Sequence, residues 1–145
     1  MQSLTKVQGV FERLNSIKEA GLTINEQQLL KFLKSLVKKQ EELLNSLQKA
    51  VDQKNWEEVL SLSLQLTQRC NAILAYSMQP TVLGSIMDTS LYQIIDEIME
   101  TSASCIAEVV MLLKKNFKEI GIDSITMNLI TNPLSVNLSI TLKGS

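Results

Sequence analysis

The residue types that could carry out chemistry are few in this sequence and widely spaced. There is no histidine, which removes the commonest general base, the usual partner of a serine or cysteine nucleophile and the commonest zinc ligand. The two cysteines, Cys70 and Cys105, are far apart and outside any C-x-x-C spacing, so we expect reduced core thiols and no zinc site. The five glycines are scattered and form no phosphate-binding loop.

Carboxylates provide the strongest remaining candidate for catalysis. On a helix Asp96 and Glu100 lie one turn apart, with Glu97 adjacent and Asp88 two turns earlier. Such a group could hold Mg²⁺ with help from a substrate phosphate. Exposed helix faces carry acidic residues routinely, and we favour that interpretation. We therefore expect no enzymatic activity, no cofactor and no metal.

Charge is nearly balanced overall but uneven along the chain. The net charge of −1 argues against a protein that neutralises nucleic-acid phosphates. Residues 1–54 hold nine Lys/Arg against six Asp/Glu, and residues 55–113 hold one against seven. These segments are either solvated helix faces that attract one another or two partner patches of opposite sign. Lys31, Lys34 and Lys38 follow one helix face without interleaved aromatic residues, so nucleic-acid binding is not expected.

The length of 145 residues predicts one domain, 1–145, with a helical bundle over 1–121 and a β-hairpin over 122–145. Aromatic residues make up only 4%, so the core must be aliphatic. The sequence has neither the pattern of a signal peptide nor a run of eighteen apolar residues. We therefore expect a cytoplasmic protein that does not associate with membranes.

The clearest structural signal runs from Asn25 to about Asp52. Its apolar residues recur at alternating steps of four and three, as in a coiled coil, with Gln40 as the polar exception; they include Leu29, Leu33, Leu36, Leu43 and Leu47. A helix of this length spans about 40 Å and needs cover from the chain or from a partner. Gln40 is either a buried amide that sets register or partner number, or a residue near an exposed end, which we favour slightly.

A shorter helix precedes this one. Its apolar residues share one face over 2–20, and Gly21 predicts a stop in the left-handed conformation. Asn25 is the predicted N-cap of the long helix, with Gln28 three residues on and a hydrophobic staple between Ile24 and Leu29.

A third helix is predicted from Asn55 to about Tyr76, because Asn55-x-x-Glu58 is a capping signal. Within it, residues 59–66 also alternate as a strand does, and we choose helix because leucine favours it. Pro80 and Gly84 then mark an interruption between about 77 and 87.

A second long helix is predicted from Asp88 to a left-handed stop at Gly121. Five small side chains, from Thr101 through Ser102 to Cys105, allow close internal packing, which we favour, or leave a groove. Met78, Met87, Met99 and Met111 fall in or near this segment. Flexible thioethers suit surfaces that adapt to apolar partners, although core filling is the favoured interpretation.

The last twenty-odd residues alternate with a period of two, which predicts a β-hairpin with one apolar face and a turn at Thr131-Asn132-Pro133. Its apolar positions are Ile125, Met127, Leu129, Val136, Leu138, Ile140 and Leu142. A lone hairpin is barely stable, so it must pack on the helices or pair with another copy. No charge occurs on its polar face before Lys143, which suggests that an edge is used by a second subunit.

The stretch Leu29 to Leu74, with its Gln40-Glu41-Glu42-Leu43-Leu44 run and the Asn55-Trp56-Glu57-Glu58-Val59-Leu60 restart, resembles the helical flagellar export chaperones. The resemblance covers about a third of the chain and does not extend to the C-terminal hairpin. It implies a dedicated chaperone.

These observations predict a mainly α protein, with a four-helix bundle-like domain built on two long central helices and a C-terminal β-hairpin. The expected function is a non-enzymatic protein-protein interaction module, an adaptor or dedicated chaperone that holds a protein partner against its helices. The alternative is a small oligomeric structural or assembly protein, or a phage or mobile-element factor, that self-associates as a dimer or higher oligomer. The expected partner contacts are Leu29, Leu33, Leu36, Gln40, Leu43, Leu47, Met99, Ser102, Val136, Leu138 and Ile140.

Overall fold

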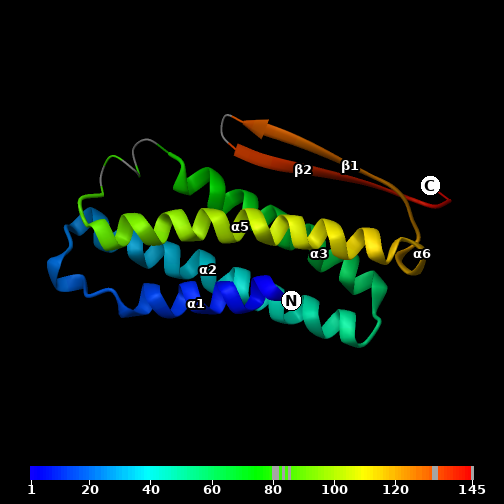
Figure 1. The fold of residues 1–145 in the computed structure, drawn as a ribbon, viewed down its shortest axis with the longest axis horizontal. Helices are drawn as coiled ribbons and strands as arrows, with labels where there is room; N and C mark the ends of the chain where they lie inside the picture. The colour runs from blue at the N-terminus through cyan, green and yellow to red at the C-terminus, as the bar shows by residue number, and fades with distance from the viewer. Residues whose placement is uncertain (80–81, 83, 85, 132–133, 145) are drawn as a thin grey trace.

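The computed structural model describes residues 1–79, 82, 84, 86–131 and 134–144. Four main helices pack together and an antiparallel two-stranded hairpin follows them, which confirms the predicted fold class (Figure 1). The helices are α1 (Gln2–Ser16), α2 (Ile24–Asp52), α3 (Trp56–Ser77) and α5 (Thr89–Lys115), and the strands are β1 (Ile122–Thr131) and β2 (Leu134–Leu142). Within the described residues, no helix combines the length and the apolar character needed to cross a bilayer.

The N-cap of the long helix α2 lies two residues earlier than predicted. Thr23 is the cap: its hydroxyl accepts a hydrogen bond from the backbone N–H of Glu26, whose carboxylate accepts one from the N–H of Thr23. This reciprocal pair satisfies two helix-terminal donors at once. The predicted cap at Asn25 was wrong, and so was the staple, because Ile24 is 74% exposed.

The first helix ends earlier than its apolar pattern suggests. α1 stops at Ser16, Ile17 is extended, and Glu19–Gly21 form a separate short 3₁₀ turn. The side-chain amide of Gln27 on α2 donates hydrogen bonds to the backbone carbonyl oxygens of Glu19 and Leu22, and so fixes the connection between α1 and α2. These hydrogen bonds from α2 favour the separate 3₁₀ turn over a continued α1. The left-handed stop predicted at Gly21 was wrong, because the described glycines with a positive φ are Gly121 and Gly144.

The helical interpretation of residues 59–66 is confirmed. The Asn55 side chain accepts from the N–H of Glu58, as the capping signal predicts, and α3 continues to Ser77. Leu62 and Leu66, one helical turn apart, are buried, whereas Leu64 between them is 37% exposed, as the period of a helix requires. Gly84 lies between α3 and α5 as expected, and Pro80 falls outside the described residues.

The second long helix starts where predicted but ends sooner. Asp88 caps α5 by accepting from the N–H of Leu91. The helix stops at Lys115, where the side-chain amide of Asn116 donates a hydrogen bond to the backbone carbonyl of Leu112. A single helical turn, α6 (Phe117–Ile120), follows. Gly121 ends that turn with a φ of +83°, so the left-handed stop predicted at this glycine is confirmed.

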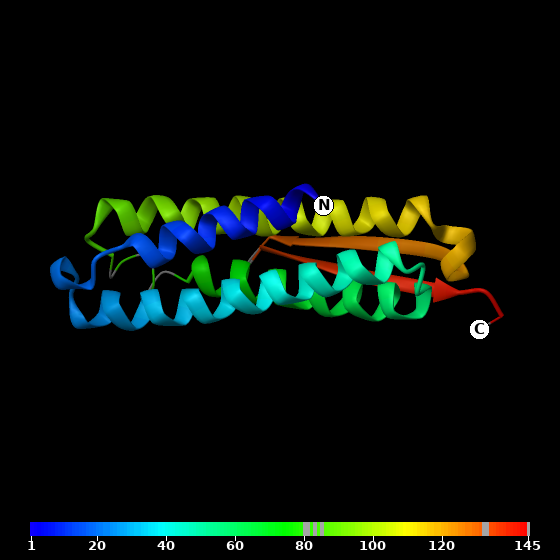
Figure 2. The ribbon, with the colours of Figure 1, turned by 90° about the horizontal axis from the view of Figure 1, so that it is seen from below.

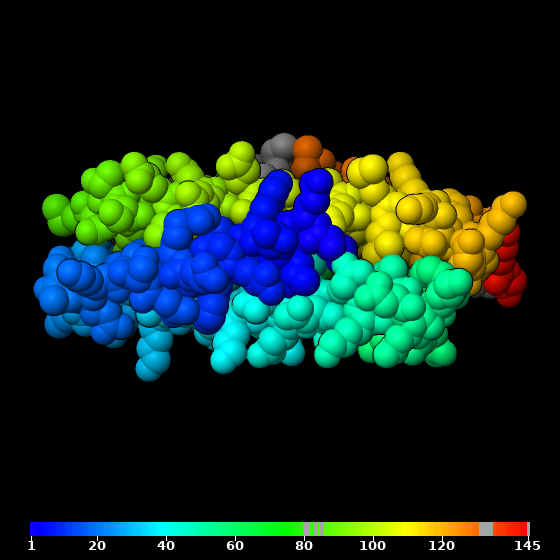
Figure 3. All heavy atoms as spheres, turned by 60° about the horizontal axis from the view of Figure 1, so that its bottom comes forward, coloured from blue at the N-terminus to red at the C-terminus, as the bar shows by residue number. Residues whose placement is uncertain are grey.

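The core is aliphatic and lies between the four helices. Fully buried leucines come from all of them, among them Leu14, Leu33, Leu66 and Leu113. α1 has 15 residues against 27 in α5, so it covers only part of the surface that α2 and α5 share. Figures 2 and 3 show the N-terminus midway along α5, with α2 and α5 facing solvent beyond it.

The hairpin is attached to the bundle through its second strand. β2 packs on α3, whereas β1 contacts α6 near its start and lies outermost over the rest of its length (Figure 1). The register pairs the apolar residues as the alternation predicts, with Ile125 opposite Ile140, Met127 opposite Leu138 and Leu129 opposite Val136. Of the predicted turn, Asn132 and Pro133 lie outside the described residues.

Candidate functional site

The leucines expected at a partner interface lie inside the bundle. Leu33 and Leu47 are fully buried, and Leu29, Leu36 and Leu43 are at most 7% exposed. A partner cannot reach them while the helices stay packed, so they act here as the core. Whether they also bind a partner stays a prediction, and the surface that is accessible in this fold lies elsewhere.

Gln40 is buried at the centre of the bundle. Its side-chain nitrogen lies 3.2 Å from Ser102 Oγ on α5 and 3.3 Å from Cys70 Sγ on α3, within hydrogen-bonding distance of both. The placement that we favoured slightly, near an exposed end, was wrong. The amide instead ties three helices together at one level, as a buried polar group does when it fixes the register of neighbouring helices.

Cys70 and Cys105 are both buried and free, which fits reduced core thiols. The Cys70 sulfur and burial both raise the pKa of Cys105. A thiol of this kind is a poor nucleophile because the thiolate is the reactive form.

The other predicted contacts are also largely covered. Ser102 is buried, Met99 is half-buried, and Val136, Leu138 and Ile140 are half-buried where β2 packs on the helices. The small-residue segment serves both predicted purposes: Ser102 packs internally, while Thr101 and Ser104 line grooves beside α1.

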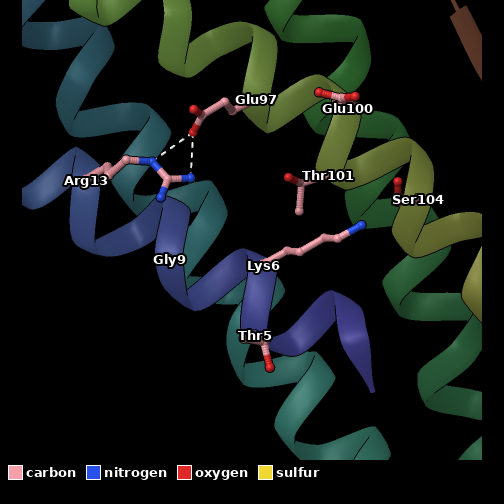
Figure 4. Close-up of a pocket in the computed structure, with 8 residues that line it drawn as sticks. All are labelled: Thr5, Lys6, Gly9, Arg13, Glu97, Glu100, Thr101 and Ser104. Atoms are coloured by element: carbon pink, nitrogen blue, oxygen red, sulfur yellow. Dashed lines mark hydrogen bonds and ion pairs between the residues drawn. The ribbon is translucent and has the colours of Figure 1, made fainter.

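A polar groove of about 420 Å³ runs between α1 and α5 (Figure 4). Arg13 spans it at one end and binds Glu97, with its Nε and Nη2 atoms 2.8 and 2.6 Å from the same carboxylate oxygen. Lys6 extends along the groove and Glu100 lies on its far wall (Figure 4). The groove is lined by Thr5, Lys6, Gly9, Arg13, Glu97, Glu100, Thr101 and Ser104.

The arrangement of this polar groove favours a structural role. Glu97 is already bound by Arg13, and Asp88 accepts from the helix it caps, so two of the four carboxylates that suggested Mg²⁺ have other partners. Among the described residues, no three acidic, cysteine or histidine side chains come together as a metal site would need.

A second, more apolar groove lies beside the first turns of α1, against the C-terminal half of α5. It measures about 830 Å³, and its floor and walls are mainly Met1, Ala107, Met111 and Leu112. Met111 is 70% exposed, so its thioether is available to a partner. Lys6 and Lys115 lie on the rim, while Glu108 is occupied by hydrogen bonds from the N–H and the hydroxyl of Ser3, at 3.0 and 2.6 Å.

Compared with family models, with curated proteins and with solved structures, the chain matches none. The site must therefore be judged on its own geometry. Core filling, the favoured interpretation of the methionines, was wrong for Met87 and Met111, which are 82% and 70% exposed. Met111 lines the groove, so the alternative interpretation, an adaptable surface, was the one sequence signal for it. The position of the groove was beyond sequence reasoning, because it depends on how far α1 reaches along α5.

A smaller apolar surface lies where α2 meets α3. The rings of Phe32 and Tyr76 are 4.5 Å apart and tilted by 53°, and Phe32 is 45% exposed. Burial raises the pKa of Tyr76. The ring pair stabilises the contact between α2 and α3 and leaves part of the Phe32 ring exposed, but it lines none of the grooves described above.

Proposed function

We propose that this chain is a non-enzymatic protein-interaction module, an adaptor or dedicated chaperone, that holds an amphipathic helix of a partner in the apolar groove beside α1. The observation that carries the proposal is Met111, which is 70% exposed inside a groove of about 830 Å³. Amphipathic helices of partner proteins bind by laying their apolar face into an apolar groove of this kind.

The position of the groove supports a helical partner. α1 packs on the α2–α5 surface through Val7, Val10 and Leu14, all buried, so this surface already accepts one amphipathic helix. The groove lies beside this packed helix, where the first turns of α1 meet the C-terminal half of α5 and leave Ala107 and Met111 exposed. A partner helix laid there would bury the Met111 side chain.

The rim supports a partner of acidic character. Lys6 and Lys115 border the groove, and the one carboxylate there, Glu108, is engaged by Ser3. An acidic residue flanking the apolar face of the partner helix would meet these two ammonium groups. Exposed pairs of this kind contribute about 0.2–1 kcal/mol each, so they set orientation more than affinity.

The test is affinity capture of the tagged chain from its native cell, followed by mass spectrometry, with Met111→Lys beside the wild type. A charge in the apolar groove should reduce partner recovery at least tenfold. Met87→Lys is the matched control, since Met87 is 82% exposed outside the groove and should change nothing. Equal recovery with Met111→Lys would show that the partner does not use this groove.

A second candidate function is a small structural or assembly protein that self-associates. The observation favouring it is the outer strand β1, whose residues Met127 and Leu129 are 56% and 65% exposed. Large apolar side chains on an exposed strand favour pairing with another strand.

A further inference from the structure

The outer edge of β1 is open. The sheet has the order β1-β2, and β1 has no second strand beside it in the described part of the chain. The other edge of β2, in contrast, is blocked at Val136, because Asn71 of α3 binds the main chain of Val136 through two hydrogen bonds, 2.6 and 2.8 Å long, and α3 packs on this strand. The asymmetry leaves β1 as the one strand available for further pairing.

The Asn71 contact also shows which backbone groups of β1 face outward. The N–H and C=O of Val136 point to α3 and away from β1, so Val136 and its partner Leu129 form a non-hydrogen-bonded pair. Since the pattern repeats every second residue, Ile125, Met127 and Leu129 direct their N–H and C=O groups to the open edge.

This edge lacks the usual protection against pairing. No charged residue occurs between Ser124 and Leu142. Met127, Leu129 and Ile130 are 56%, 65% and 42% exposed. Natural edge strands usually carry lysine, proline or inward-pointing charges that prevent association. An uncharged edge with exposed apolar side chains is suited to receive another strand.

We propose that a second copy of this chain pairs its β1 with this β1, antiparallel and centred on Met127, to form a four-stranded sheet. In this register Met127 lies opposite its counterpart and Ile125 lies opposite Leu129, so all three outward-facing residues form hydrogen-bonded pairs. Their apolar side chains share one face, and Thr126 lies opposite Asn128 on the other. Asp123, the charged residue of the strand, falls outside these pairs and meets no like charge.

The area of the edge predicts a weak dimer. Nine residues of each β1, 123–131, overlap in this register; at about 3.3 Å each, over a sheet thickness of about 10 Å, they give about 300 Å² per copy. Stable interfaces bury about 800 Å² per partner. We therefore expect association in the micromolar range and a monomer–dimer equilibrium that depends on concentration.

This inference rests on the second candidate function, self-association, and is independent of the groove beside α1. The test is light scattering and sedimentation over about 1 μM to 1 mM. The wild type should shift from monomer to dimer. Met127→Lys should raise the apparent dissociation constant at least tenfold, because two ammonium groups then lie opposite each other across the pair. Met87→Lys, at a methionine that is 82% exposed and lies outside both β1 and the groove, is the matched control and should dimerise as the wild type does.

A mixing experiment tests the register and guards against misfolding. Met127→Glu alone should also be monomeric, and an equimolar mixture of the Lys and Glu variants should dimerise again, because opposite charges then meet. Circular dichroism should give the same helix signal for every variant. A wild type that stays monomeric throughout would overturn both self-association and the β1 site. A dimer that survives Met127→Lys, or a mixture that stays monomeric, would overturn the β1 register while leaving self-association by another surface.

Discussion

The side-chain amide of Asn71 and the main chain of Val136 join the helical bundle to the hairpin by two hydrogen bonds, in which the amide donates to the carbonyl and accepts from the N–H. The amide takes the place that a neighbouring strand would have at the edge of β2. A single α3 residue thus caps the β2 edge at Val136 and fixes which main-chain groups of the hairpin face outward.

Asn71→Ala should loosen the hairpin. It removes both bonds and leaves the N–H and C=O of Val136 without partners in a half-buried place, which costs about 1–3 kcal/mol. Urea denaturation should show this loss, and the amide proton of Val136 should exchange faster with solvent. Asn137→Ala, at an exposed hairpin position, is the control and should change stability little. Equal effects of the two substitutions would contradict the role of Asn71.

Ser102→Ala should destabilise the bundle by about 1–2 kcal/mol, because it leaves a buried donor of Gln40 with one partner fewer. Adding Gln40→Leu should recover much of this loss, since an apolar side chain then fills the site and no polar group is left unpaired. The double-mutant cycle, measured by urea denaturation, should give a clear interaction between the two positions. Simple additivity would show that the two groups act independently.

Stability should fall in acid partly because of Glu26. Its carboxylate accepts hydrogen bonds from the N–H groups of Thr23, Asp88 and Met87, and these bonds lower its pKa. A carboxyl group whose pKa is lowered in the folded state stabilises the fold at pH values above its ordinary pKa. This contribution is lost as the pH falls through the lowered folded-state pKa.

Glu26→Gln should therefore be less stable than the wild type at neutral pH, and its stability should change less between about pH 5 and pH 2. Thermal denaturation across this range is the measurement. Glu12→Gln, on the exposed face of α1, is the control and should follow the wild-type profile. Parallel profiles for wild type and Glu26→Gln would contradict the assignment.

Both cysteines should resist thiol reagents in the folded protein. Cys70 and Cys105 are fully buried, and the raised pKa of Cys105 keeps its thiolate scarce. We expect two thiols to react with Ellman's reagent in urea and essentially none in buffer, with native labelling no faster than global opening. Rapid native labelling of either cysteine would show that the core opens locally.

Local sequence was sufficient to predict the helices, the hairpin and most of the start and stop signals. Asn55, Asp88 and Gly121 act through neighbours within a few residues, so their patterns carry the information themselves. The same holds for the alternation that pairs Met127 with Leu138. The cap predicted at Asn25 was wrong, because Thr23 and Glu26 together satisfy two backbone donors.

The tertiary structure alone decided which surfaces are available. Leu33 and Met111 are both apolar residues on long helices, yet one is fully buried and the other is 70% exposed, because α1 reaches only part of the way along α5. The burial of Gln40 depends on Ser102 and Cys70, which are 62 and 30 residues away along the chain. Burial is a property of contacts between distant segments, and periodicity in one segment cannot specify how far its neighbour extends.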